Sequence, residues 1–311
     1  MEHKSLGRSG LRVSVVGLGC NNFGQRCDQA QTRAVVAKAL DLGVTLFDTA
    51  DVYGGQGVSE EYLGKALESR RADVIVATKF GMPMGDGSLK RGGSRRWVMQ
   101  AAENSLRRLG TDYIDLYQIH LPDAGTPIEE TLRALDDLVR QGKVRYLGCS
   151  NYAGWQVVEA AWTARSASLS PFVSAQNFYN LLERNVEREL VPACNTYGLG
   201  VLPYFPLASG LLTGKYRRGE AAPEGTRLSA PRFGKSALTD KNFDKLEKLA
   251  GFAADAGHSL LELAIGWLAS QSHVSSVIAG ATKPEQVEQN VRAAERKLSP
   301  AELARVNEVG T

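Results

Sequence analysis

The sequence has few cysteines, little net charge and no long apolar run, and each of these absences excludes a class of protein. No stretch approaches the roughly 18 apolar residues that a transmembrane helix needs, and the N-terminal residues lack the apolar region of a signal peptide. Four cysteines without CxxC spacing in 311 residues exclude a disulfide-held mini-domain and favour a reducing, cytoplasmic location. A net charge of +3 gives no indication of nucleic acid or a membrane surface as a partner.

What remains is the composition of an ordinary globular domain. Hydrophobic residues make up 43% and charged residues 23% of the chain, which is enough apolar material for a large core. Residues 1–311 are predicted to form a single domain, because barrels of alternating strands and helices routinely exceed about 200 residues as one unit.

Strand-like and helix-like segments alternate along most of the chain. Short runs rich in β-branched and aromatic residues predict eight strands, at residues 15–19, 44–48, 74–79, 114–120, 144–150, 173–176, 199–204 and 276–279. Amphipathic stretches predict helices at 28–42, 94–109, 128–141 and about 185–197, each followed by a glycine suited to a left-handed C-cap. Two further helices are predicted at 242–256 and 259–270.

This alternation predicts a (β/α)8 TIM barrel in preference to an open doubly wound sheet. The segment Gly17-Leu18-Gly19-Cys20-Asn21-Asn22 after the first strand lacks the third glycine of the GxGxxG motif, which further weakens the open-sheet interpretation. Residues 4–13 are predicted to form an N-terminal β-hairpin with its turn at 7–10.

Four polar residues lie at or just past the ends of predicted strands, namely Asp48, Tyr53, Lys79 and His120. In a parallel α/β barrel, catalytic groups gather at the carboxyl ends of the strands. One such residue alone is more often a satisfied buried polar group, but four at equivalent strand ends favour an active site. A nearby cation stabilises a phenolate, so lysine and aspartate beside tyrosine indicate acid–base chemistry.

Three long motifs resemble those of the aldo-keto reductase family. The first, FDTADVYG at 47–54, continues to Ser59-Glu60 and Leu63-Gly64; the second, LGTDYIDLYQIH, spans 109–120; the third joins 143–145 to GCSNY at 148–152. The resemblance covers nearly the whole chain and implies a (β/α)8 barrel whose bottom is closed by an N-terminal hairpin. It also implies a bacterial-type, NADPH-dependent reductase of aldehydes and ketones.

The resemblance assigns the catalytic tetrad of the family to Asp48, Tyr53, Lys79 and His120. By analogy, hydride passes from the nicotinamide to the carbonyl carbon while Tyr53 protonates the carbonyl oxygen. A free tyrosine has a pKa of about 10. Lys79 is therefore expected to lower that pKa, Asp48 to keep Lys79 charged, and His120 to orient the carbonyl oxygen.

The same resemblance implies a site for NADPH or NADP+, with NADH bound more weakly. Gly19, Cys20, Asn21 and Asp48 are expected at the cofactor, with Ser150, Asn151 and Gln176 on the carboxamide and Tyr204 stacked on the nicotinamide. The pyrophosphate is expected at Leu207, Ser209, Leu211 and Lys215. The adenosine and its 2′-phosphate are expected at Gly280, Thr282, Lys283, Gln286, Gln289 and Asn290. Gln289 replaces the usual glutamate and Lys283 stands for a frequent arginine, which reduces the expected preference for NADPH.

Residues 210–240 interrupt the alternation as a long loop after the seventh strand, rich in Gly, Pro, Arg and Ser. A loop of this length is usually a functional lid or a disordered linker, and its position at the strand ends favours a lid. By the resemblance its first part binds the pyrophosphate. Residues 215–235 are therefore expected to be mobile without the dinucleotide and ordered with it, with Lys215, Arg217 and Arg218 attracting the phosphates.

The expected substrate is a small carbonyl compound in a pocket formed by Phe23, Tyr53, Phe80, Met82, His120, Tyr152 and Trp155. For Phe23 and Trp155, packing between the barrel and its helices is an equally good interpretation. Asn21 stands where mammalian relatives carry tryptophan, which implies a more open and polar pocket. No metal site is predicted, and the expected assembly is a monomer or a small homo-oligomer.

Two other functions remain open from the sequence. One is a nucleotide-sensing, weakly catalytic regulatory subunit resembling potassium-channel β-subunits, which also keep the tetrad. We expect no N-terminal gating extension and no partner-binding patch, which favours the reductase. The other is a cofactor-free barrel isomerase or aldolase, which the complete tetrad argues against.

Overall fold

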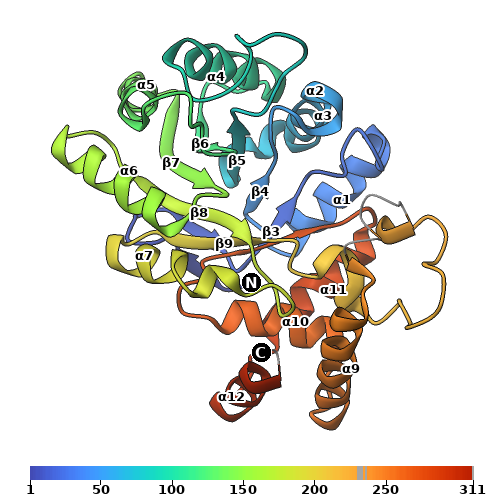
Figure 1. Ribbon diagram of the computed structural model, residues 1–311. Helices are drawn as coiled ribbons and strands as arrows, with labels where there is room; N and C mark the ends of the chain where they lie inside the picture. Colours follow the sequence, from blue (N-terminus) through green and yellow to red (C-terminus); the bar gives the residue numbers. More distant parts are fainter. Residues whose placement is uncertain (230–233, 235–236, 310–311) are drawn as a thin grey trace.

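A closed barrel of eight parallel strands forms the centre of the molecule (Figure 1) in the computed structural model, which describes residues 1–229, 234 and 237–309. The strands are β3 (Val16–Gly19), β4 (Leu46–Asp48), β5 (Ile75–Phe80), β6 (Ile114–Ile119), β7 (Val144–Ser150), β8 (Phe172–Phe178), β9 (Gly200–Tyr204) and β10 (Val277–Gly280). They pair in chain order, and β10 pairs with β3 to close the barrel. The predicted (β/α)8 barrel is confirmed, with each strand within two residues of its predicted ends.

A ring of helices surrounds the barrel (Figure 1). Its members are α1 (Gln29–Asp41), α3 (Val58–Leu67), α4 (Arg95–Leu109), α5 (Ile128–Arg140), α6 (Gly154–Ser166), α7 (Leu190–Tyr197), α10 (Leu260–Ser270) and α11 (Pro284–Glu295). In α5 the residues Leu132, Leu135 and Leu138 are buried against the barrel, as the amphipathic pattern requires. Outside the ring, α9 (Asp240–Asp255) and α12 (Pro300–Val309) pack against each other.

Left-handed glycines follow all four of the helices predicted to have them, with Gly43 (φ 76°) after α1 and Gly142 (φ 73°) after α5. Gly110 follows α4 with φ 64° and Gly198 follows α7 with φ 78°, both in the left-handed region where glycine carries no steric cost. The predicted helix over 185–197 is instead a 3-10 turn η2 (Asn185–Glu187) followed by α7. Proline has no amide hydrogen and is tolerated only in the first turn of a helix, so Pro192 fixes the start of α7 just before it.

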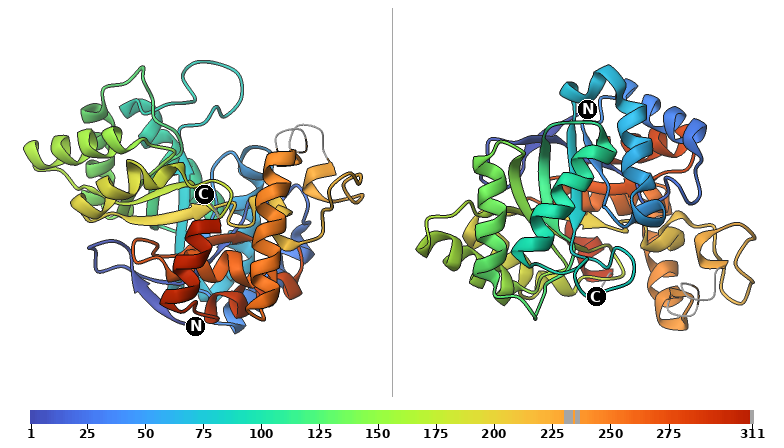
Figure 2. Two further views of the ribbon diagram at one scale, coloured as in Figure 1. Left: turned by 60° about the horizontal axis from the view of Figure 1, so that its bottom comes forward. Right: turned by 90° about the horizontal axis from the view of Figure 1, so that it is seen from above.

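The N-terminal hairpin closes the bottom of the barrel. Its strands β1 (His3–Ser5) and β2 (Arg12–Ser14) pair antiparallel, and it is drawn in dark blue near the N-terminus in Figure 2. Leu6 and Val13 of the hairpin region are buried together with Leu46, Leu116 and Leu202 of the barrel. This apolar plug seals the amino ends of the strands, so a ligand must enter at their carboxyl ends.

The long connection from β9 to α9 lies at the carboxyl ends of the strands, on the side of α11 (Figure 1). Its described parts include η3 (Ala208–Thr213) and η4 (Arg227–Ser229), whereas 230–233, 235 and 236, within the predicted lid, lie outside the described residues. Arg26 Nη2 donates to the Gly225 oxygen at 2.8 Å, which ties this connection to the segment after β3. Two smaller elements, α2 (Tyr53–Gln56) and η1 (Glu68–Asp73), flank α3.

Candidate active site

A buried ion pair joins the ends of β4 and β5. Lys79 is 0% exposed and Asp48 is 3% exposed. The Lys79 Nζ donates to Asp48 Oδ2 at 2.7 Å and to the Thr49 carbonyl oxygen at 2.8 Å. Because both groups are removed from water, each depends on the other for compensation of its charge.

Tyr53 and His120 lie on the cavity side of this pair. Tyr53 is the first residue of the short helix α2, and the centroid of its ring lies 5.1 Å from Lys79 Nζ. His120 follows β6, and its ring meets that of Tyr53 edge to face with centroids 5.7 Å apart. The four residues, which the sequence placed at the ends of three strands, are therefore neighbours in space.

Burial dominates the electrostatics of the site. It raises the pKa of Tyr53, and although Lys79 acts to lower it, the net direction is upward. Lys79 acts on this pKa in the expected direction, but burial has the larger effect. Burial also lowers the pKa of Lys79, but Asp48 and Tyr53 outweigh it, so the pKa is raised and the ammonium is retained.

His120 is neutral over the physiological range. Burial, followed by the charge of Lys79, lowers the pKa of His120 from 6.5 to about 3. The imidazole is 8% exposed, and its Nδ1 has no hydrogen-bond partner in the described part of the chain. It can therefore donate one hydrogen bond to a ligand oxygen without changing its charge.

This shift predicts acid sensitivity with a definite sign. In the unfolded chain His120 binds a proton below pH 6.5, whereas in the folded protein it does so only below about pH 3. The free energy of unfolding is therefore unaffected by His120 above pH 6.5 and decreases as the pH falls from 6.5 toward 3. The loss amounts to about 2 kcal/mol at pH 5. We expect thermal unfolding of His120→Gln to be less sensitive to a change from pH 7 to pH 5 than that of the parent. Equal sensitivity would show that His120 is not held neutral.

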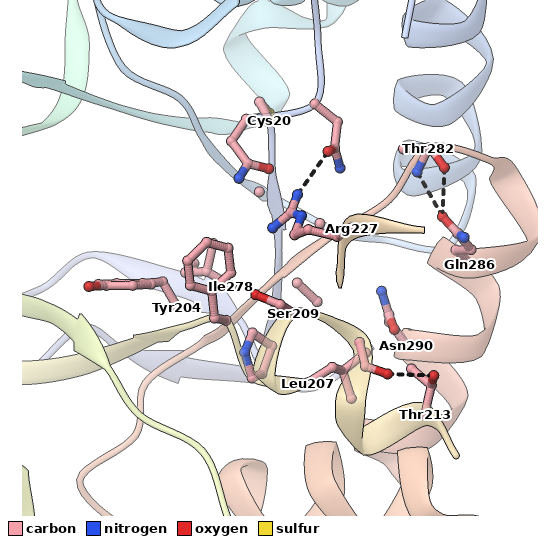
Figure 3. A pocket seen from close by; sticks show the side chains of 18 of the residues that line it. Cys20, Tyr204, Leu207, Ser209, Thr213, Arg227, Ile278, Thr282, Gln286 and Asn290 are labelled. Carbon is pink, nitrogen blue, oxygen red and sulfur yellow. Dashed lines mark hydrogen bonds between the residues drawn. The ribbon is translucent and has the colours of Figure 1, made fainter. Parts of the chain in front are cut away.

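A cavity of about 1170 Å³ extends from these residues to the start of α11. Figure 3 shows Tyr204 and Ile278 toward one end, and at the other Thr282 just before α11 with Gln286 and Asn290 on it. Of the residues predicted from the sequence, those in its walls are Gly19, Cys20, Asn21, Asp48, Tyr53, Met82, His120, Ser150, Asn151, Gln176, Tyr204, Leu207, Ser209, Lys215, Gly280, Thr282, Lys283, Gln286, Gln289 and Asn290. Lys79 lies beneath this wall, behind Asp48.

Five predicted contacts are not in the walls of the cavity. Phe23, Phe80, Tyr152 and Leu211 are buried in the core, where Phe80 stacks on Tyr117. Trp155 lies on α6 and is 59% exposed. Their side chains fill space between the barrel and the helices or face solvent. This geometry does not support their predicted direct contact with substrate or cofactor.

A hydrogen-bonded chain organises the tetrad end of the cavity. The Tyr204 hydroxyl donates to Asn151 Oδ1 at 2.7 Å, and Asn151 Nδ2 donates to the His120 carbonyl oxygen at 2.9 Å. Asn151 adopts φ 60°, a left-handed conformation that asparagine tolerates better than most residues. Phe178 stacks on Tyr204 with centroids 5.8 Å apart. The ring that was expected to stack on a nicotinamide is thus held firmly in the cavity wall.

Two glutamines hold the carboxylate of the ion pair, which the sequence did not reveal. Gln176 Nε2 donates to Asp48 Oδ1 at 2.8 Å, and Gln118 Nε2 donates to the same oxygen at 3.2 Å. Gln176 was expected to contact only a cofactor. No role was predicted for Gln118, which lies within the second family motif. The alternation of residues along a strand does not reveal which buried group a side chain contacts.

The cations of the long connection are arranged differently from the expectation. Arg218 forms ion pairs with Asp240, Asp244 and Glu247 of α9 and is absent from the cavity wall, as is Arg217. Arg227 instead reaches into the cavity (Figure 3). Its guanidinium donates to Asn22 Oδ1 at 3.0 Å and lies 5.2 Å from the centroid of the Phe205 ring.

The far end of the cavity has the chemistry of a phosphate site. Lys283 is the N-cap residue of α11, and Lys215 contributes a second ammonium to the wall. Helix N-termini present unpaired amide hydrogens and a positive dipole end, which favour anions. Thr282 donates its amide and hydroxyl to Gln286 Oε1. A long cavity with an aromatic wall at one end and cations at the other fits an extended, anionic dinucleotide.

Comparisons with known proteins agree with this geometry. The model of the Aldo/keto reductase family matches residues 15–311. A "Probable voltage-gated potassium channel subunit beta" of Oryza sativa subsp. japonica is 40% identical over 94% of this chain and 91% of its own length. An "L-glyceraldehyde 3-phosphate reductase" of Escherichia coli (strain K12) is 36% identical over 99% of this chain and 92% of its own length.

A third similar protein is an uncharacterized oxidoreductase of Bacillus subtilis (strain 168), 37% identical over 99% of this chain and 96% of its length. None of the helices in the described ranges has the length and apolar character needed to span a bilayer. The fold, the site and these similarities lead to one conclusion: this chain belongs to the aldo/keto reductase family.

Proposed function

We propose that the protein reduces aldehydes and ketones to alcohols with NADPH, and that Tyr53 is the general acid. The buried Lys79–Asp48 pair beneath Tyr53, at one end of a dinucleotide-sized cavity, carries this proposal. An isolated buried lysine is costly, and here its charge lies where a phenolate would form. We further propose a cytoplasmic protein that is a monomer or a small homo-oligomer.

Each member of the tetrad has a separate task in the proposed reaction. The bound nicotinamide would supply the hydride. Tyr53, which is protonated at neutral pH, donates its proton to the carbonyl oxygen. Lys79 then stabilises the phenolate that remains, and neutral His120 donates a hydrogen bond that orients the oxygen. Asp48 keeps Lys79 charged and in place.

The remaining walls are proposed to hold the cofactor. Ser150, Asn151, Gln176 and Tyr204 would bind the nicotinamide, while the cations Lys215 and Arg227 would bind the pyrophosphate. Gly280, Thr282, Gln286, Gln289 and Asn290 would surround the adenosine, and Lys283 at the α11 N-terminus would bind the 2′-phosphate. A substrate would then lie against Met82 and His120, and against Leu121 and Phe205, which the sequence did not indicate.

NADPH is expected to be preferred over NADH, with Lys283 providing much of the difference. Lys283→Ala should weaken NADPH binding by roughly 1–3 kcal/mol, the usual value of a hydrogen bond to a charged group. It should hardly affect NADH, which has no 2′-phosphate. Titration calorimetry with both cofactors measures this, and equal weakening would show that Lys283 acts on the helix instead of the phosphate.

The long connection is expected to become more protected when the dinucleotide binds. Lys215 and Arg227 lie in the cavity wall, so binding of phosphates would draw the segment between them toward the barrel. Hydrogen exchange across residues 215–229, with and without NADPH, tests this. Equal protection in both states would leave the segment as a surface loop.

A second candidate function is a nucleotide-sensing, weakly catalytic regulatory subunit. It is supported by relatives named as potassium channel β-subunits, such as the rice protein and one of Arabidopsis thaliana that is 37% identical. Measuring NADPH consumption with a panel of aromatic and short-chain aldehydes separates the two. Rapid turnover supports the reductase, whereas tight NADPH binding with negligible turnover on every carbonyl compound favours the regulatory subunit.

A further inference from the structure

Gln118 lies in the barrel interior beside the ion pair. It stands on β6 between Lys79 of β5 and Gly148 of β7, and it is 0% exposed. Its Nε2 donates to Asp48 Oδ1 at 3.2 Å, while Lys79 occupies Oδ2. The two oxygens of one carboxylate are thus held by donors from two adjacent strands.

Glycine at the neighbouring position provides the space that this side chain uses. A Cβ atom on Gly148 would come within 3.0 Å of Gln118 Cγ and 2.5 Å of Ser174 Oγ. A larger residue at position 148 would therefore push against the side chains of Ser174 and Gln118, the latter of which reaches Asp48 from here.

The direction of the amide is fixed by Asp48. Gln118 Oε1 is buried and finds no hydrogen-bond partner among the described residues. Reversing the amide would turn that acceptor toward the Asp48 carboxylate, which is also an acceptor. A buried amide with one unpaired oxygen is less favourable than an apolar side chain of similar size. Stability of the fold alone does not account for glutamine here, whereas its bond to the ion pair does.

Gln176 cannot perform the same task when a ligand is present. It donates to Asp48 Oδ1 as well, but it lies in the cavity wall, where its amide faces whatever occupies the tetrad end. Gln118 is not in that wall, so a ligand in the cavity does not contact its amide. Of the two glutamines that donate to Asp48, Gln118 is therefore the one whose amide a ligand in the cavity does not compete for.

We propose that Gln118 is a positioning residue, which holds Asp48 Oδ1 so that Oδ2 stays on Lys79 throughout the reaction. The proposal rests on the reductase function proposed above. Gln118 touches neither the cavity nor, in that scheme, the substrate, so its effect passes through Asp48 to Lys79 and from there to Tyr53.

The test replaces Gln118 with methionine, which keeps the length of the side chain but removes the donor. We expect kcat for carbonyl reduction to fall about 10-fold, the effect of losing one hydrogen bond to a charged group. KM for the carbonyl compound and Kd for NADPH should stay unchanged. The melting temperature should change little, because removal of the buried, unpaired Oε1 offsets the lost hydrogen bond to Asp48.

A matched control and a second background show whether the effect passes through Asp48. Tyr117→Phe removes a buried hydroxyl without a partner among the described residues, from the preceding position on β6, and should leave kcat unchanged. In an Asp48→Asn background, Gln118→Met should cause less than about a twofold further loss, because the group that it positions is gone.

A third variant gives a pH signature that a structural role would not produce. Gln118→Glu can donate to Asp48 only when its carboxyl is protonated. Its ionisation at higher pH places a second negative charge beside Asp48. We therefore expect kcat of Gln118→Glu, relative to the parent, to decrease as pH rises.

The outcomes separate the two proposals. If the parent reduces carbonyl compounds and Gln118→Met keeps the parental kcat, the positioning role is wrong and the reductase function stands. If Gln118→Met loses activity only together with a lower melting temperature, the role is structural and the proposal is again wrong. If the parent consumes no NADPH with any of the carbonyl compounds, both proposals are wrong.

Discussion

Replacing Tyr53 with phenylalanine should lower kcat for carbonyl reduction by about 100-fold or more, while Kd for NADPH remains nearly unchanged. The hydroxyl acts on the carbonyl oxygen only as that oxygen gains negative charge, so its loss is felt in the transition state. Burial raises the pKa of Tyr53, so transfer of its proton depends on Lys79, which acts in the opposite direction and stabilises the phenolate. Steady-state rates and fluorescence titration with NADPH measure the two quantities.

The matched control for this prediction is Tyr197→Phe. Tyr197 lies at the end of α7, outside the cavity wall, and its hydroxyl accepts a hydrogen bond from Trp162. This variant should keep the parental kcat. Near-normal turnover of Tyr53→Phe on simple aldehydes would show that another group is the acid.

The barrel could be predicted from the sequence because its signals are local. Strands buried on both sides are short, continuous apolar runs, and glycines such as Gly110 and Gly198 mark the ends of helices. Parallel strands place their carboxyl ends at one edge, so residues separated in sequence, such as Asp48 and His120, could be expected to meet. The predicted helix at 185–197 is too long because amphipathic periodicity continues through a 3-10 turn, whereas Pro192 is tolerated only in the first turn of α7.

Contacts that depend on packing could not be predicted. Whether Phe80 lines a pocket or stacks on Tyr117 depends on a side-chain direction that the sequence does not specify. The charge of Arg218 is satisfied by α9, far along the chain, whereas Arg227 reaches the cavity. A basic residue in a loop therefore indicates attraction to an anion but does not say which anion.

The electrostatics of the tetrad illustrate the same limit. From residue types alone, a lysine beside Tyr53 predicts a lowered pKa, but burial acts on the same group in the opposite direction and is larger. The degree of burial is a property of the folded molecule. The sequence therefore predicts which residues interact, and the structure decides which of the opposing effects is greater.

Replacing Lys79 with methionine should abolish activity and also destabilise the protein. The substitution removes the charge that stabilises a phenolate. Among the described residues it leaves Asp48, 3% exposed, with the neutral donors Gln118 and Gln176 alone. Breaking a buried ion pair by removing one partner costs about 3–5 kcal/mol. The two glutamines already present should place the result toward the lower end of that range. Urea unfolding at neutral pH measures it.

The double variant Lys79→Met with Asp48→Asn separates the two effects. It removes both charges, so the uncompensated carboxylate disappears and much of the lost free energy of unfolding should return. Activity should not return, because the cation beside Tyr53 is still missing. If Lys79→Met is inactive yet as stable as the parent, or if Asp48→Asn restores no stability to it, the buried pair does not contribute to the fold and Lys79 acts on Tyr53 alone.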